Sequence, residues 1–255
     1  MTTPLKVWRE ADGRLLRVRL NRPKANLIDA EMIAALDRAF AEHLGNTHIA
    51  AILLDAEGPH FSFGASVEEH LPDQCAAMLA GLHGLVIRMV DSQTPILAAV
   101  RGQCLGGGLE VALAAHLIFV AADATLGQPE MKLGVFAPAA SCLLPELIGP
   151  ARAFDLLVSG RPLTGAEAAA IGIAIAANGD PEQAALAYIA EHLMPKSASS
   201  LRFAVRAARL DYVLRVRAKL AAVERLYLDE LMKTRDALEG LQAFIAKRAA
   251  KWEHC

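Results

Sequence analysis

Apolar segments short enough for strands alternate with amphipathic helical segments along the chain up to Pro150, and this alternation leaves few possible architectures. The runs at 50–55, 96–100 and 117–120 read as buried strands. Apolar residues at helical spacing predict one helix after Asp29, which can cap it, and another from about Gln74 to Val90. Strands that alternate with helices in this way predict an α/β fold.

The two ends of the chain have different patterns. Alternating apolar residues around an Ala11-Asp12-Gly13 turn predict a hairpin from about Leu5 to Leu20. Beyond Pro150 the patterns are almost wholly helical, at Ala151–Ser159, Ala166–Ile171 and Pro181–His192 and in long amphipathic runs from Ser199 to Arg248. We therefore expect a core region at 1–195 and a helical C-terminal region at 196–255.

The composition argues against several classes of protein. Lys and Arg together number 26 and Asp and Glu 28, so the chain carries no overall charge that would attract nucleic acid or an anionic membrane surface. Hydrophobic residues make up 54% of the chain, yet no stretch reaches the ~18 uninterrupted apolar residues of a membrane helix. The start lacks the apolar core of a secretory signal, and the four cysteines form no C-x-x-C pair. We expect a cytoplasmic protein with neither nucleic acid nor membrane as a partner.

Two glutamates carry the most specific chemical signal. Glu110 falls on the first turn of an otherwise apolar helix, and Glu130 follows Pro129 in a loop-like stretch twenty positions later. Taken alone, Glu110 would more often complement the helix dipole and Glu130 would more often be solvated. A buried carboxylate, however, is costly unless it has a partner or a task, and burial raises its pKa toward the range of acid–base exchange. Two such carboxylates can add or remove water, because one deprotonates the water while the other protonates carbon.

A glycine turn could supply the electrostatic part of such a site. Gly107 lies where the turn Gly106–Gly108 enters the helix, so that its backbone amide can approach a ligand oxygen closely at the positive end of the helix dipole. The segment Phe61–Ser66 could present a second backbone N–H. Two such donors would form a cradle for a carbonyl oxygen that gains negative charge.

These motifs occur in the order found in the crotonase, or enoyl-CoA hydratase, superfamily, which the chain resembles over nearly its whole length. The similar segments are 21–26, 100–110, 126–130 and 243–248. The resemblance implies a spiral of stacked ββα units, followed by a helical region that mediates trimer contacts, usually within a dimer of trimers. It also implies an acyl-CoA thioester as the substrate.

The resemblance further implies roles for individual residues. Gly107 and Ala65 would donate the two amides of the oxyanion cradle, and Glu110 and Glu130 would form the acid–base pair. Ser66 stands where the family frequently has Asp, and Ser66 can still cap the turn that follows it. No metal or redox cofactor is required, because hydration moves neither hydride nor electrons, and the eight histidines show no ligand spacing.

Binding of the CoA part is also implied by the resemblance. The residues expected to contact it are Arg22, Lys24, Ala25, Gly64, Ala65, Phe244 and Lys247. Phe244 and Lys247 would belong to a C-terminal helix that closes over the CoA nucleotide of a neighbouring subunit. A charged surface loop is the alternative for Arg22 and Lys24, and a solvated helix face is the alternative for Lys247. We read His60 and His70 as loop or surface residues.

The segment after Gly134 bears on the substrate. Many hydratases have I-P-G-A-G-G-T there, whereas this chain has a segment without glycine at 135–145, which predicts a reshaped acyl pocket. With the segments 58–70 and 101–105, it resembles a branch of the superfamily that hydrates a cyclic dienoyl-CoA thioester in anaerobic benzoate degradation. This implies 1,4-addition, with the hydroxyl placed on the β carbon and the proton on the far end of the diene. A straight-chain or cyclohexenoyl 2-enoyl-CoA hydratase is the alternative.

Other classes of function fit less well. A serine hydrolase would need G-x-S-x-G, and the stretch 64–68 lacks the second glycine. A dinucleotide-binding protein would need G-x-G-x-x-G, and the glycines at 102 and 106–108 have the wrong spacing. RNA binding would require an exposed stripe of arginines on the C-terminal helix, at Arg202, Arg206, Arg209, Arg215 and Arg217.

Overall fold

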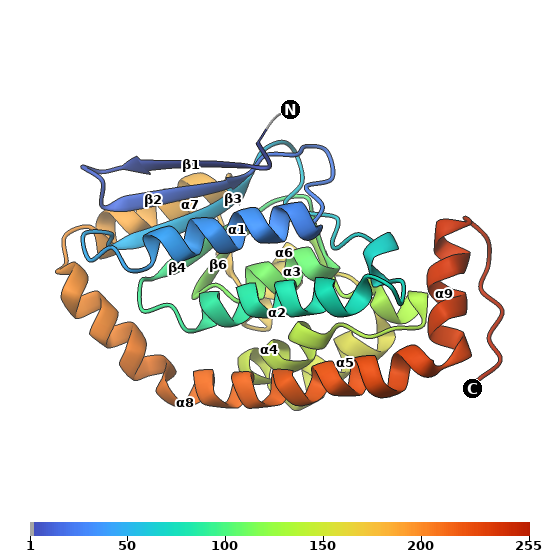
Figure 1. Ribbon diagram of the computed structural model, residues 1–255. Helices are drawn as coiled ribbons and strands as arrows, with labels where there is room; N and C mark the ends of the chain where they lie inside the picture. Colours follow the sequence, from blue (N-terminus) through green and yellow to red (C-terminus); the bar gives the residue numbers. More distant parts are fainter. Residues whose placement is uncertain (1–2) are drawn as a thin grey trace.

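The computed structural model, which describes residues 3–255, contains a six-stranded main sheet in the order β1-β2-β3-β4-β6-β9 (Figure 1). β1 and β2 are antiparallel, and every later neighbour is parallel. The predicted hairpin and the three buried strands are confirmed, whereas the three-residue β9 lies in the part of the chain whose patterns are almost wholly helical. The strands are β1 (Leu5–Glu10), β2 (Leu15–Leu20), β3 (Ala51–Ala56), β4 (Ile96–Val100), β6 (Leu117–Ala121) and β9 (Ile175–Ala177).

Both faces of this sheet are covered, which explains why its central strands β3 and β4 are apolar at every position except Asp55. Alternate side chains such as Leu53 and Phe119 pack on one face against the region of α7 (Pro181–Tyr188). Their neighbours such as Leu54 face the opposite core, which contains α1 (Ala30–His43) and α2 (Cys75–Val90) (Figure 1). The Asp29 side chain caps α1 as predicted, by accepting a hydrogen bond from the Met32 amide.

A second, smaller sheet gives the chain its spiral course. It consists of β5 (Gln103–Leu105), β7 (Thr125–Gly127) and β8 (Leu163–Thr164). β4 of the main sheet runs into β5 of the small sheet and then into α3 (Gly106–Leu113), which makes one ββα unit. β6 and β7 repeat the two-strand step. The expected crotonase-like spiral is therefore confirmed, although the short strands of the second sheet were not predicted.

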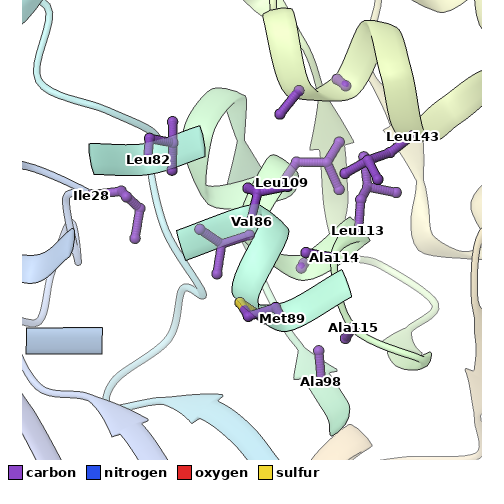
Figure 2. Packing of buried hydrophobic residues seen from close by; sticks show 14 of the residues in the cluster. Ile28, Leu82, Val86, Met89, Ala98, Leu109, Leu113, Ala114, Ala115 and Leu143 are labelled. Atoms are coloured by element: carbon purple, nitrogen blue, oxygen red, sulfur yellow. The ribbon is translucent and has the colours of Figure 1, made fainter. Parts of the chain in front are cut away.

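The core fixes α3, the helix that carries Glu110. Leu82 and Val86 of α2 lie beside Leu109 of α3 (Figure 2). Leu143 comes from a further helix, α4 (Pro138–Ile148), which the sequence analysis had not predicted. Because all these side chains are almost fully buried, α3 is held between two helices rather than at the surface.

The last part of the chain is mainly helical and packs against the core through α8 and α9. Two further helices, α5 (Pro150–Ser159) and α6 (Gly165–Ala170), precede α7. α8 (Ala198–Arg225) then runs along the base of the molecule and α9 (Arg235–Ile245) stands across its end (Figure 1). A π-helical turn at Leu226–Glu230 and a 3-10 turn at Leu231–Lys233 separate the two, so the amphipathic runs predicted between Ser199 and Arg248 fall on two helices. Among the described residues, no helix is long and apolar enough to cross a membrane.

The arginines of α8 are largely engaged within the chain, contrary to the exposed stripe that RNA binding would need. Arg202 donates to the Thr47 carbonyl, and Arg209 donates to the Ala115 carbonyl. Arg215 pairs with Glu146 and Asp211, and Arg217 pairs with Asp91. These contacts favour the interpretation of α8 as a helix packed against the core.

Candidate active site

Close backbone approach requires the glycines at the start of α3. Gly106 has φ +49°, and a Cβ at this position would lie 2.6 Å from Oε1 of Glu130. A Cβ at Gly108 would lie 2.5 Å from the Cβ of Ser62. The turn therefore brings the start of α3 against Glu130 on one side and the segment around Ser62 on the other.

Two successive spiral units bring Gly107 beside Ala65. Ser62 pairs with Cys104 of β5, since its amide donates to the Gln103 carbonyl at 2.9 Å and its carbonyl accepts from the Leu105 amide at 3.0 Å. A Cβ at Gly107 would lie 3.3 Å from the Ala65 nitrogen. Because Gly107 is in the first turn of α3, its N–H has no acceptor within the helix. The two backbone segments thus meet where a cradle for an oxyanion requires them.

Ser66 does not cap the turn after it, contrary to our expectation. Its hydroxyl donates to Oε2 of Glu68 at 3.0 Å, and the 3-10 turn Glu68–His70 has no side-chain cap. The placement of Ala65 depends instead on the bridge to Ile28, whose amide donates to the Gly64 carbonyl at 2.9 Å.

Glu110 is buried, with 3% of its surface exposed. Its Oε1 accepts a hydrogen bond of 2.9 Å from the amide of Ala140 in α4. Burial raises the pKa of Glu110, and the Ala140 hydrogen bond opposes that rise. The segment that replaces the usual glycine-rich sequence thus orients Glu110 as well as forming part of the pocket wall.

Glu130 lies in the 3-10 turn Pro129–Leu133, rather than in a loop, and is half-buried. Burial and then the charge of Glu110 raise the pKa of Glu130 to about 8. The Gln128 amide, oriented with its nitrogen toward Glu130, donates to both carboxylate oxygens at 3.1 and 3.2 Å. Two carboxylates that interact in this way resist ionising together, so over an intermediate pH range one is ionised while the other keeps its proton. The pair is thereby equipped with a base and an acid at once.

A cavity of about 570 Å³ leads to Glu130. Its volume suits a sizeable small-molecule ligand. Glu110 and Gly107 are not among its lining residues, although their neighbour Gly106 is. The lining residues near the two backbone segments are Gly64, Ala65, Leu105, Gly106, Glu130 and Val135, and residues farther along include Leu27, His70, Lys132, Phe244 and Arg248.

The residues expected to bind CoA fall into two groups. Gly64, Ala65 and Phe244 line the cavity, whereas Arg22, Lys24, Ala25 and Lys247 are outside its lining. Arg22 makes an ion pair with Asp29. We had expected α9 to close over a neighbouring subunit, but here it lines the cavity of its own chain.

The structure also adds lining residues that sequence reasoning missed. Two cationic side chains, Lys132 and Arg248, lie in the cavity lining. They are far apart in the sequence, so no local sequence pattern links them. His70, which we had read as a loop or surface residue, also lines the cavity, and its Nδ1 lies 2.7 Å from the Ser66 carbonyl. Burial lowers the pKa of His70, so the ring is neutral at pH 7. Within residues 3–255, no three His, Cys, Asp or Glu side chains converge in a metal-binding group.

The chain belongs to the enoyl-CoA hydratase/isomerase family, part of the crotonase superfamily, because the family profile of that description matches residues 10–254. The chain is 63% identical over 253 residues to the cyclohexa-1,5-dienecarbonyl-CoA hydratase of Thauera aromatica, covering 99% of this chain and 98% of that protein. It is 31% identical to the carnitinyl-CoA dehydratase of Salmonella typhi, over 95% of this chain and 96% of that one. The crystal structure of carnitinyl-CoA hydratase from Mycobacterium avium has a TM-score of 0.87 at 27% identity and covers 100% of both chains.

Proposed function

We propose that the protein hydrates cyclohexa-1,5-diene-1-carbonyl-CoA to 6-hydroxycyclohex-1-ene-1-carbonyl-CoA. The observation that carries the hydration chemistry is the coupled pair Glu110 and Glu130 beside the amides of Ala65 and Gly107. The choice of a cyclic diene is supported by the 63% identity to the Thauera aromatica hydratase.

The reaction follows from the two protonation states of the pair. The ionised carboxylate takes a proton from water while the water oxygen bonds to the β carbon of the ring. Electrons move through the diene onto the thioester oxygen, where the amides of Ala65 and Gly107 stabilise the negative charge. The protonated carboxylic acid then donates its proton to the far end of the diene. One water is consumed, and each carboxyl group ends in the state from which the other began.

The cavity suits the thioester arm of the substrate. In our proposal, pantetheine lies along Gly64 and Ala65 under Phe244, and the phosphates reach the cations Lys132 and Arg248. Arg22 and Lys24 precede Leu27, which lines the cavity, so they remain candidates for the nucleotide end. We propose that α9 covers CoA bound to its own chain.

We also propose a homo-oligomer built from trimers, with α8 in the region that mediates contacts. This is supported by family membership and by exposed apolar side chains on α8. A cytoplasmic location is proposed as well, supported by the three buried free thiols of Cys75, Cys104 and Cys142.

The test compares the dienoyl thioester with crotonyl-CoA and cyclohex-1-ene-1-carbonyl-CoA as substrates. We expect catalytic efficiency on the cyclic diene to exceed that on crotonyl-CoA by at least ~100-fold, since a rigid ring and a short chain differ in transition-state binding. Loss of the dienoyl absorbance gives the rate, and chromatography identifies the alcohol. Equal efficiency on both would make the protein a general 2-enoyl-CoA hydratase, with the role of the glutamates unchanged.

A further inference from the structure

Tyr227 carries a hydroxyl that the surrounding protein does not satisfy. Its side chain is fully buried, and no atom of residues 3–255 makes a hydrogen bond with its oxygen. Buried hydroxyls in native proteins nearly always have a partner, so each exception asks for one from a ligand or water.

The fold places the Tyr227 ring against Phe136, which adjoins the cavity-lining residue Val135. The residue lies in the π-helical turn Leu226–Glu230, at the point where α8 ends. Such turns are frequent at functional sites. Its ring packs edge-on against Phe136, with the ring centroids 5.2 Å apart. Phe136 follows Val135, which lines the cavity and whose amide donates to the Glu130 carbonyl.

Two of the groups whose charge affects the pKa of Tyr227 are the glutamates of the candidate active site. Burial raises the pKa of Tyr227, and Cys75, Glu130 and Glu110 add to that rise. The phenol therefore stays protonated and can donate a hydrogen bond.

We propose that Tyr227 is a further substrate-contacting residue, whose hydroxyl donates a hydrogen bond to the oxygen that is added to the ring. This inference rests on the proposed function of the same site.

A hydrogen-bond donor at the position of the Tyr227 hydroxyl orients the attacking water. The water gives one hydrogen to the ionised carboxylate and directs one lone pair at the β carbon. Tyr227 occupies the second lone pair, which fixes the orientation of the first. After the C–O bond forms, the same hydrogen bond holds the product hydroxyl. Tyr227 itself transfers no proton.

Tyr227→Phe tests the hydroxyl while keeping the ring against Phe136. We expect kcat for hydration of the cyclic diene to fall ~10-fold or more, and affinity for the hydroxylated product ester to fall ~10-fold. Affinity for cyclohex-1-ene-1-carbonyl-CoA, which lacks that hydroxyl, should stay within ~2-fold of the wild-type value. The difference between the two esters is the decisive readout, because a loss of packing would weaken both.

Tyr212→Phe is the matched control. The Tyr212 hydroxyl is also buried without a partner in the described part of the chain, but its ring lies 5.0 Å from the Arg209 guanidinium in α8. This variant should keep wild-type kinetics. Thermal unfolding of both variants measures any structural effect.

The proposal is overturned if Tyr227→Phe keeps wild-type kcat and product affinity, or if it weakens both esters equally. Failure of the wild type to hydrate the cyclic diene would instead contradict the proposed function. In that case the same comparison, made with 3-hydroxybutyryl-CoA and butyryl-CoA, would decide the role of Tyr227 on a straight-chain substrate.

Discussion

At the scale of single residues, the central feature is the pair of interacting carboxyl groups of Glu110 and Glu130. Both pKa values are raised chiefly by burial, and the charge of Glu110 raises that of Glu130 further. Hydration needs one ionised and one protonated carboxyl, and only the singly protonated pair provides both.

The first prediction is a bell-shaped pH dependence of kcat for hydration. Above pH about 8, the pKa of Glu130, the pair loses its remaining proton and the acid is gone, so the rate should fall as pH rises. At acidic pH the pair gains a second proton and the base is gone. Fixed-time assays across pH 5–10 would check this. A rate that stays level from pH 7 to about 10 would contradict the interpretation that the singly protonated pair is the active form.

Replacing either glutamate by glutamine should lower kcat by ~10²-fold or more while thioester binding stays near normal, because the amide keeps the shape but cannot transfer a proton. Rates of Glu110→Gln and Glu130→Gln, together with titration of a CoA ester, provide the measurement. A variant that hydrates at the wild-type rate would remove its residue from the mechanism.

Although Glu130→Gln should lower the rate of hydration, it should raise the stability of the folded protein relative to wild type as pH rises. The folded pKa, about 8, lies above the ordinary value of 4.5, so the folded state binds more protons than the unfolded state between these pH values. Wild-type stability therefore falls as pH rises through that window. The glutamine variant lacks this loss, so its Tm relative to wild type should increase from pH 5 to about pH 8. The exposed Glu42→Gln is the control and should show no such trend.

At the scale of elements, the sequence predicted those helices and turns whose residue pattern is either repeated over several turns or contiguous in the chain. α1 and α2 repeat their apolar spacing over several turns, and the glycine turn before α3 is contiguous. β5, β7 and β8 have two or three residues each, too few for alternation to be visible. Glu110 and Glu130 were identified from motifs, whereas Lys132 and Arg248 meet at the cavity only through the packing of α9.

That packing depends on Gly240. A Cβ there would lie 2.1 Å from the Leu133 carbonyl oxygen, which is backbone and cannot move aside easily. Gly240→Ala should displace α9 from the cavity and raise KM for the thioester ~10-fold or more, with a smaller effect on kcat, because α9 contacts the carrier rather than the reacting carbons. Gly84→Ala in α2, where an added Cβ meets nothing within 4 Å, is the matched control. An unchanged KM would remove α9 from the binding wall.

At the scale of the whole molecule, the exposed apolar face of α8 calls for a partner. Phe203, Leu210 and Leu214 are 67%, 63% and 63% exposed and recur at helical spacing on one side. Phe154 on α5 is 68% exposed. Exposed apolar side chains that gather on one face typically mark an interface, and the family membership favours further copies of the same chain.

We therefore predict that light scattering will give a mass at three or six times the 27.2 kDa of one chain. Leu214→Glu should shift this mass toward the single chain, since burying an unpaired carboxylate in an apolar interface is unfavourable. Ala208→Glu, also exposed on α8 but about 200° around the helix from Leu210, should leave the mass unchanged.

Because Glu110, Glu130, the two amides and α9 all come from one chain, dissociated protein that stays folded should retain hydration activity. A wild-type monomer at micromolar concentration would contradict the assembly, and a folded but inactive Leu214→Glu monomer would show that a neighbouring copy completes the site.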